Sequence, residues 1–563
     1  MIKKLILIWI IALSSLVQSQ LYAVDPSGKE PKVDDFNKSI PTLPPATEPQ
    51  LKEPTEQEQT GSEEIKIEIK KFNFTGNTVL TNAQLSELTE NYIGKSLSYN
   101  ELKDVLRLIS NLYRQLGLWA RAILPEQDIN NGEVQIQVIE GRLGKIIIQT
   151  DEESLKLSQQ VARNYVEYKI SRQRILNIDQ LEKNIQTLNT VPGIQAVATL
   201  EAGQNVGETD VLVQLQNKKS LSGTFQADSF GSRSSGYNRG TVLLNFDSLL
   251  KQGEQFTIQS VQTIGSEYNA LAGSFRIGYA GTRATVKAAK LRYDLGDPFS
   301  SSNPTGNSEE ISVSFDHPLN PVGKINLSSN LTLSQSDYEN KNNTPSNIQK
   351  TISRAITKLN FNRADQFYKG GVNFGSLSLT VGDLDDTSTN STTANALGSF
   401  SKLNANLSRF QRLTDQDVLQ VNLSGQYSFK NLDSAEKFSL GGPYGIRAYP
   451  NSEGQGDHGV MANIELKHGF SPTIEGMIFY DWGRIQQHQN TYSSWNSNNA
   501  SLKNIYELQG MGIGARWNPN QTTTVNWIFS STIGSNEGDD ADGLDNDGFN
   551  KDKRSYLSIT SRF

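Results

Sequence analysis

The chain has 563 residues, enough for two to four domains, and it contains no cysteine, which excludes disulfides and thiolate metal sites. Its formal net charge of -7 becomes -9 (-7 minus 2) if Lys3 and Lys4 leave with a leader peptide, and this acidity argues against nucleic acid as the main partner. Mean hydropathy is -0.49, and past the N-terminus no apolar run reaches the roughly 20 residues of a membrane helix. These values exclude a helical membrane protein. They leave open a membrane β-barrel, in which only alternate residues face lipid.

The N-terminus has the pattern of a secretory signal. Lys3 and Lys4 precede an apolar core, Leu5 to Leu16, and a small residue, Ala23, ends the segment. An uncleaved membrane anchor is the alternative, but the apolar core is short for a span, so we expect residues 1–23 to be removed. Residues 24–63 are polar and Pro-rich, which predicts a flexible or polyproline-like linker.

A compact unit is expected over residues 64–143. A strand-like stretch at 65–77 is followed by two helices that begin at capping boxes, Thr81 with Gln84 and Ser98 with Glu101. The second helix has one apolar face at helical spacing, and two strands follow at 119–128 and 132–141. The predicted order is β-α-α-β-β.

Residues 144–217 repeat this order. A strand at 144–150 is followed by predicted helices at 153–170 and 177–191, and then by strands at 193–203 and 208–217. Two α+β repeats therefore precede the rest of the chain.

From residue 218 the helical spacing gives way to short alternating segments separated by Gly, Asn, Asp and Ser. Sixteen strands are expected, beginning near Leu221, Gly240, Glu254, Tyr268, Arg283, Glu310, Lys324, Ile352, Gly371, Ser399, Val418, Gly459, Ile474, Tyr506, Thr523 and Tyr556. An even number of such strands behind a secretion signal predicts a 16-stranded antiparallel outer-membrane barrel over 218–563. A soluble β-sandwich or β-helix array is the alternative.

The stretch "LGGPYGIRAYP", residues 440–450, is a Gly- and Pro-rich loop with one arginine, Arg447, between two alternating strands. In the strand after those two, "IEGMIFYDWG", the alternation that turns Ile478 and Tyr480 toward lipid turns Phe479 and Asp481 into the lumen. If the loop folds inward, Arg447 and Asp481 match as a bidentate pair. Composition alone equally allows an exposed loop with both charges in water.

The motifs of this chain resemble those of the TpsB transporters of two-partner secretion, a branch of the outer-membrane assembly and secretion superfamily. The likeness runs from about residue 65 to Phe563 and is carried by motifs in family order, among them "FTGNTVLT", "ILPEQDINNGEVQIQVIEGRLG", "SFDHPLNP", "LGGPYGIRAYP" and "FYDWG". The resemblance implies that the two repeats are polypeptide-transport-associated (POTRA) domains and that residues 431–456 fold into the barrel.

The resemblance also implies roles for individual residues. Gly441, Gly442, Arg447 and Tyr449 would form the translocation-loop motif, and Phe479, Asp481 and Gly483 its partner on the barrel wall. Phe563 would be the signal for the barrel-assembly machinery. The predicted cargo contacts in the first repeat are Leu112, Arg121, Ile123 and Leu124.

Two features depart from the family pattern. Ala448 stands where relatives usually have glycine, and alanine does not easily adopt a positive φ, so a different local backbone is expected. Many relatives have an N-terminal plug helix, and the Pro-rich segment 24–63 does not favour one.

Other chemistry finds little support in the sequence. Asp545 and Asp547 lie in an acidic stretch with calcium-loop-like spacing, but the twelve-residue pattern that ends in Glu is absent, so an acidic surface loop is favoured over a metal site. No nucleophile–base or paired-carboxylate site can be argued. We therefore expect a non-enzyme without cofactor.

The functional prediction is an outer-membrane pore. It would capture an unfolded TpsA-type exoprotein in the periplasm through open POTRA sheet edges and secrete it. The expected partners are this exoprotein, outer-membrane lipid and the assembly machinery, for a chain acting as a monomer. One alternative is an assembly factor for other barrels, which usually carries more POTRA domains. Another is a passive porin or surface receptor, which would have no such repeats. The sequence does not name the cargo, which could be a haemolysin, an adhesin, a contact-dependent toxin or a haem-scavenging protein.

Overall fold

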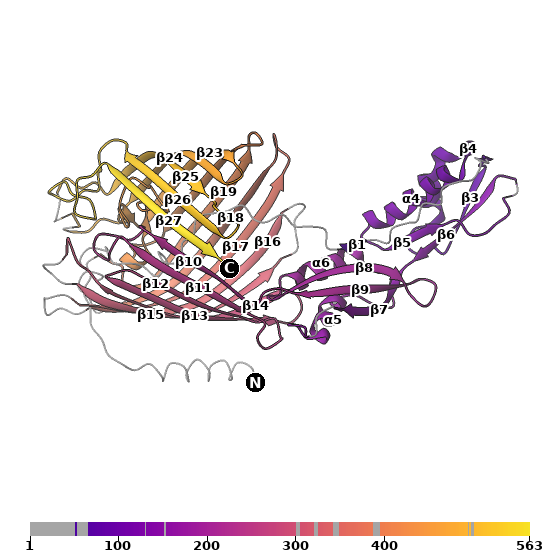
Figure 1. Cartoon of the computed structure of the whole chain (residues 1–563), viewed down its shortest axis with the longest axis horizontal. Helices are drawn as coiled ribbons and strands as arrows, with labels where there is room; N and C mark the ends of the chain where they lie inside the picture. The colour runs from indigo at the N-terminus through magenta and orange to yellow at the C-terminus, as the bar shows by residue number, and fades with distance from the viewer. Residues whose placement is uncertain are drawn as a thin grey trace.

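The computed structural model describes residues 51–52, 66–129, 131–150, 154–299, 304–319, 325–341, 348–386, 394–493, 495–496 and 500–563. The predicted signal and nearly all of the predicted linker lie outside these residues. Figure 1 shows a barrel with two small α+β units in a row beyond one of its rims.

The first unit follows the predicted β-α-α-β-β order. Its elements are β2 (Ile67–Glu68), β3 (Lys71–Thr75), α3 (Asn82–Thr89), the 3-10 turn η1 (Glu90–Tyr92), β4 (Ser96–Leu97), α4 (Tyr99–Gln115), β5 (Ala120–Ile123) and β6 (Glu133–Glu140). The sheet has the order β3-β6-β5, and both predicted capping boxes are present, at Thr81 and Ser98. The small β2–β4 pair was not predicted from the sequence.

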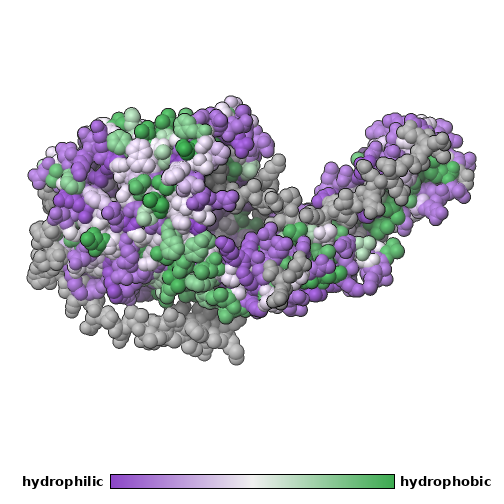
Figure 2. Space-filling model, viewed as in Figure 1, coloured by the Kyte–Doolittle hydropathy of each residue, from purple (hydrophilic) through white to green (hydrophobic). Residues whose placement is uncertain are grey.

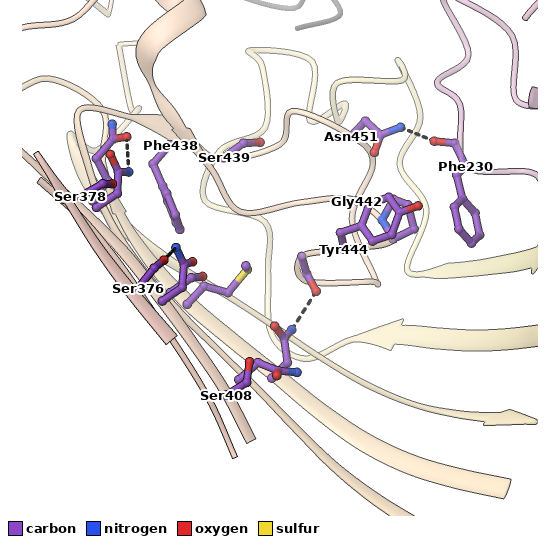
Figure 3. Close-up of a pocket in the computed structure, with 18 of the residues that line it drawn as sticks. Phe230, Ser376, Ser378, Ser408, Phe438, Ser439, Gly442, Tyr444 and Asn451 are labelled. Atoms are coloured by element: carbon purple, nitrogen blue, oxygen red, sulfur yellow. Dashed lines mark hydrogen bonds between the residues drawn. The ribbon is translucent and has the colours of Figure 1, made fainter. Parts of the chain in front are cut away.

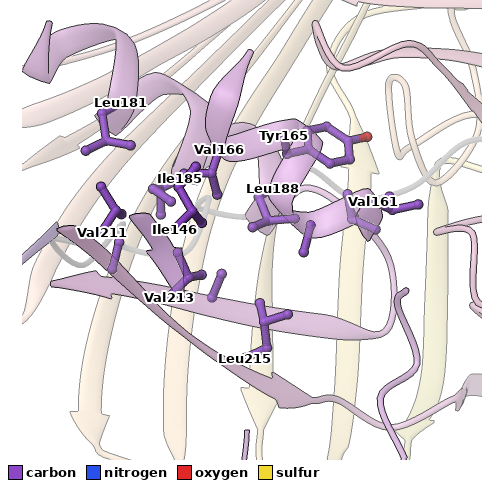
Figure 4. Close-up of a cluster of buried hydrophobic side chains, with 14 of the residues drawn as sticks. Ile146, Val161, Tyr165, Val166, Leu181, Ile185, Leu188, Val211, Val213 and Leu215 are labelled. Carbon is purple, nitrogen blue, oxygen red and sulfur yellow. The ribbon is translucent and has the colours of Figure 1, made fainter. Parts of the chain in front are cut away.

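The second unit repeats the plan with β7 (Arg142–Gln149), α5 (Gln159–Glu167), α6 (Ile178–Asn189), β8 (Ile194–Ala202) and β9 (Glu208–Asn217). Figure 4 shows apolar side chains of both helices packed against those of the sheet, among them Leu181, Ile185 and Val211. The prediction of a helix from residue 153 was wrong, since α5 begins at Gln159. The amides of Lys156 and Ser158 instead donate to Asn217 Oδ1 and to the Lys251 carbonyl.

The β8 edge of the second sheet carries an added strand from the chain itself. Strand β1 (Leu51–Lys52) pairs in parallel with β8, Leu51 opposite Ala198 and Lys52 opposite Thr199, which gives the order β1-β8-β9-β7. This edge therefore accepts an extended segment.

The predicted 16-stranded antiparallel barrel is confirmed. Its strands close through a β10–β27 seam and are β10 (Leu221–Asp228), β11 (Arg239–Asp247), β12 (Gln255–Gln262), β13 (Ser266–Ile277), β14 (Thr282–Asp294), β15 (Thr305–Pro318), β16 (Asn326–Lys341), β17 (Ile348–Asp365), β18 (Gly371–Asp386), β19 (Gly398–Arg412), β20 (Asp417–Ser428), β23 (His458–Ser471), β24 (Ile474–Gln486), β25 (Ile505–Trp517), β26 (Thr523–Thr532) and β27 (Lys553–Arg562). The largest error in an expected start is five residues, at β15, where Glu310 was expected and Thr305 is observed.

The two faces of the barrel wall differ as the alternation predicts. Leu423, Val460 and Ile478 are exposed on the outside, whereas the lumen-facing side chains Glu465 and Asp481 are buried. Hydrophobic residues are visible over the strand-covered wall in Figure 2, and hydrophilic residues dominate the loop end. Within the described residues, no helix is long and apolar enough to cross a lipid bilayer.

The second unit contacts the rim of the barrel that faces it, through two turns between barrel strands. Tyr279, in the β13–β14 turn, accepts a hydrogen bond of 2.7 Å from Asn164 Nδ2 and meets the Tyr165 ring edge to face, with centroids 5.2 Å apart. In the β11–β12 turn, Ser248 Oγ donates to the Pro192 carbonyl at 2.6 Å. The unit is thus fixed to one part of the rim.

We expect Tyr279→Ala to loosen this docking. The loss of one ring pair and one hydrogen bond, together about 2 kcal/mol, should raise trypsin cleavage at the exposed joint Lys218–Lys219 by at least about tenfold while the folded barrel persists. The matched control is Tyr368→Ala, which changes an exposed tyrosine of the β17–β18 turn. Equal cleavage in the two variants would contradict the docking role.

Candidate functional site

The segment between β20 and β23, residues 429–457, forms a long loop that lies inside the barrel; we call it the lumen loop. It contains the 3-10 turn η2 (Ser434–Glu436) and a small antiparallel pair, β21 (Phe438–Ser439) with β22 (Gln455–Gly456). The lumen loop and the inner wall together line a cavity of about 1350 Å³ (Figure 3). Three sets of contacts hold it there.

The first set centres on Arg447 and Asp481. The Arg447 guanidinium donates to the Asp481 carboxylate from Nε at 2.9 Å and from Nη2 at 2.7 Å, and the Arg447 backbone amide donates to the same carboxylate at 3.0 Å. Asn463 Nδ2 adds a fourth hydrogen bond at 2.9 Å. Arg447 is 5% exposed and Asp481 0%, so this is a buried bidentate ion pair.

The pair belongs to a larger network on the inner wall. Arg447 Nη1 donates to Glu465 at 2.6 Å, and Glu465 lies 3.1 Å from Lys467 Nζ. The Arg447 guanidinium also lies over the Phe479 ring, 3.5 Å from its centroid. Two cations thus balance two carboxylates, which is how a buried charge cluster avoids an uncompensated charge.

Glycines of the wall make room for the tip of the lumen loop. A Cβ at Gly483 would lie 2.6 Å from Leu440 Cδ2, and a Cβ at Gly510 would lie 2.7 Å from Ala448 Cβ. The backbone of Ala448 does not have a positive φ. Alanine therefore fits here without the strain that a positive φ would impose on a residue with a Cβ. Ala448 therefore packs against Gly510 as part of the loop core.

The remaining predicted loop residues also lie in the tip. Gly442 has φ +107°, and Gly441 has no space for a side chain, since a Cβ there would lie 2.2 Å from the Pro450 carbonyl oxygen. Tyr449 is buried, and its carbonyl accepts a hydrogen bond from the Tyr556 hydroxyl at 3.2 Å. The predicted motif residues are therefore brought together with the predicted wall residues.

The second set of contacts holds the first limb of the lumen loop to the wall at β17 and β19. Glu436 is buried between Arg354 Nε, at 2.6 Å, and Lys402 Nζ, at 2.8 Å. Asp433 lies 3.2 Å from Lys350 Nζ. These ion pairs were not predicted from the sequence, because the alternation along the strands does not show which wall residues the acidic groups of the loop will meet.

The third set holds the returning limb. The Glu453 carboxylate accepts from the Asn546 amide at 2.8 Å, and Asn451 Nδ2 donates to the Phe230 carbonyl at 2.7 Å. The lumen loop thus contacts the loops before β11 and before β27 as well as the wall.

The acidic stretch near residue 545 is tied to a cation of the chain. Arg554 Nη2 lies 2.6 Å from Asp545 and Arg554 Nη1 2.9 Å from Asp547. Among the described residues, no group of three or more His, Asp or Glu side chains is arranged to hold a metal ion.

The predicted cargo contacts lie on two faces of the first unit. Arg121 and Ile123 alternate with Ala120 and Ala122, which are buried in the core, so they lie on the outer face of the sheet. Leu112 and Leu124 instead pack against the core. The structure does not bring these four side chains onto one surface.

Phe563 lies at the seam of the barrel. Its ring stacks on Phe225 with centroids 5.5 Å apart, and its amide donates to the Gly223 carbonyl at 3.1 Å. This contact extends the β10–β27 pairing.

Fold and site together define an outer-membrane β-barrel translocation protein with POTRA units and a lumen loop locked to the wall. Residues 207–517 match the family of haemolysin secretion/activation proteins ShlB/FhaC/HecB, and residues 67–141 match the ShlB-type POTRA domain. The chain belongs to this family of TpsB transporters, which secrete partner exoproteins across the outer membrane and have periplasmic POTRA domains.

Known proteins support this assignment. The chain is 27% identical over 470 residues to the heme/hemopexin transporter protein HuxB of Haemophilus influenzae (strain 86-028NP), covering 80% of this chain and 81% of the relative. It is 24% identical over 484 residues to the outer membrane transporter CdiB of Dickeya dadantii (strain 3937), covering 82% and 83%. The solved structure of CdiB from Escherichia coli has the same fold, with a TM-score of 0.67, 18% identity and coverage of 94% and 95%.

Because Arg554 already pairs with both Asp545 and Asp547, we expect neither calcium nor a chelator to move the melting temperature of the barrel, measured by heat-modifiable migration. A calcium-dependent rise that disappears in the Asp545→Ala, Asp547→Ala double variant would reverse this interpretation. The control for a general charge effect is Asp542→Ala, at an exposed position of the same loop.

Proposed function

We propose that this chain secretes a TpsA-type exoprotein in an extended state through its lumen, and that the lumen loop is the gate. The observation that carries the proposal is the position of the lumen loop, which lies inside the barrel and is held by buried ion pairs. A polypeptide can pass when the loop moves, so the same contacts that close the lumen would set when it opens.

Space for water beside the buried ion pairs would allow the gate to open. The cavity beside the loop, about 1350 Å³, is large enough to hold many waters, so released charges would find solvent close by. Arg447 leaving Asp481 would be costly in a dry site and much less so once water enters. The arrival of a hydrated chain would thus lower the barrier to loop release.

Capture is proposed at the β8 edge of the second unit. The pairing of β1 with β8 supports this choice, since an extended cargo segment could add in the same way once it displaces Leu51–Lys52. The β5 edge of the first unit is less open, because its Ala122 amide already donates to Ser110 Oγ at 3.0 Å. Four residues of the first unit remain weaker candidates for cargo contact: Leu112, Arg121, Ile123 and Leu124.

The chain would act as a monomer without enzymatic activity, with Phe563 read by the barrel-assembly machinery during insertion. Among the cargo classes, the likeness to a heme/hemopexin transporter adds weight to a haem-related exoprotein, beside haemolysins, adhesins and toxins. The rival role of an assembly factor for other barrels is disfavoured by the family match over residues 207–517.

Deleting residues 65–217 should abolish secretion while a folded barrel still reaches the membrane, because the capture edges are lost and the strand pairing is not. Secretion is measured as cargo in the medium, and heat-modifiable migration measures the barrel. Undiminished cargo in the medium would contradict capture by the POTRA units.

Arg447→Ala should reduce secretion more than it reduces the amount of barrel. It leaves Asp481 and Glu465 buried with Lys467, an uncompensated charge that costs on the order of 3 kcal/mol where the site is dry. Asp481→Ala should be milder, since Arg447 keeps Glu465. The double variant should be less than additive. Strictly additive effects, or full secretion by Arg447→Ala, would show that the pair does not hold the gate.

A further inference from the structure

One part of the inner wall that lines the cavity carries a row of uncharged polar side chains. Across five neighbouring strands, β16 to β20, one row of lumen-facing residues alternates serine and asparagine in direct register: Ser328, Asn360, Ser376, Asn406 and Ser424. We call it the Ser/Asn row. With strands about 4.8 Å apart it spans about 19 Å of the wall.

The Ser/Asn row is uncharged but rich in hydrogen-bonding groups. Each serine offers a hydroxyl and each asparagine an amide with both donors and acceptors. Their contacts with one another are long, 3.4 Å from Asn360 Nδ2 to Ser328 Oγ and 3.5 Å from Asn406 Nδ2 to Ser376 Oγ, so these groups can exchange partners at little cost. The side chains are half-exposed or exposed within the cavity.

Three of the long charged side chains of the same wall bind the lumen loop, whereas Lys358 of β17, two residues from Asn360, lines the cavity. Lys350 and Arg354 of β17 and Lys402 of β19 bind Asp433 and Glu436 of the lumen loop. The loop tip is bound at β23 and β24. In Figure 3 the wall with Ser376 and Ser408 faces the lumen loop with Phe438 and Tyr444 across the cavity. Movement of the loop would therefore widen the space in front of the Ser/Asn row without altering the row.

We propose that the Ser/Asn row is the track on which the exported polypeptide slides, recognised through the peptide groups of an extended segment and not through its side chains. This rests on the proposed function. The side chain of asparagine is an amide, so it can pair with the peptide group, which presents one N–H donor and one C=O acceptor per residue. Passage through a pore requires binding strong enough to enter and weak enough to leave, and interchangeable uncharged hydrogen bonds meet both conditions. A row of charges or of apolar groups would hold particular sequences instead.

The test places the photo-reactive residue p-benzoylphenylalanine singly at positions 376, 406 and 424, in cells that express a cargo stalled by a tightly folded C-terminal fusion. The expected result is crosslinked cargo at all three positions. The matched controls are 377 and 407, where lipid-facing leucines lie next to the row in sequence and should give none above background. A second set, at Ala272 of β13 and Thr285 of β14, lines the same cavity on another part of the wall. Heat-modifiable migration confirms that each variant folds.

Three outcomes are distinguished. Crosslinks confined to 376, 406 and 424 support the track. Crosslinks equal or stronger at 272 and 285 overturn it while leaving passage through the lumen intact. Crosslinks at neither set, in a variant that still secretes the cargo without the fusion, overturn both the track and the proposed function.

Discussion

The arrangement of the lumen depends on one buried carboxylate. Asp481 sits at 0% exposure on β24 and has its oxygens satisfied by Arg447 and Asn463. An ionised group in that position is tolerable when a cation and further donors reach it, so the lumen loop has to enter the barrel and present Arg447. Positions 483 and 510 then require glycine, because any side chain there would push the loop tip away from the wall. A buried pair of this kind is weak support for overall stability, and its value here is that it fixes one position of the loop.

The lumen consequently has two chemically different parts. Ion pairs line the walls that hold the loop, at β17 and β19 for the first limb and at β23 and β24 for the tip. The Ser/Asn row, on β16 to β20, itself contains no ionisable group. Placing charges where the loop must be held, and uncharged polar groups where a chain would move, separates closure from conduction. Either property could then change without the other.

Much of this fold follows from the sequence, because its signals are local. Alternation with a period of two fixed the strands and the lumen-facing side of Phe479 and Asp481, and the capping boxes at Thr81 and Ser98 fixed two helix starts. The Arg447–Asp481 pairing came from resemblance, since composition equally allowed both charges in water. The ion pairs of Glu436 with Arg354 and Lys402 escaped prediction because they depend on the path of a loop and on register across several strands. The start of α5 was predicted too early because the amides of Lys156 and Ser158 donate to Asn217 and Lys251, which are distant in the sequence.

Because the barrel is closed, the lumen loop could move without opening the wall. Every strand of the barrel is paired on both sides, counting the seam, so the wall keeps its hydrogen bonds whatever the lumen loop does. The second unit is fixed to the rim at the β11–β12 and β13–β14 turns, through Ser248 and Tyr279. The Ser/Asn row lies further round the wall, on β16 to β20. A segment held at the β8 edge would therefore reach the lumen beside the docked unit and would pass round the wall to the Ser/Asn row.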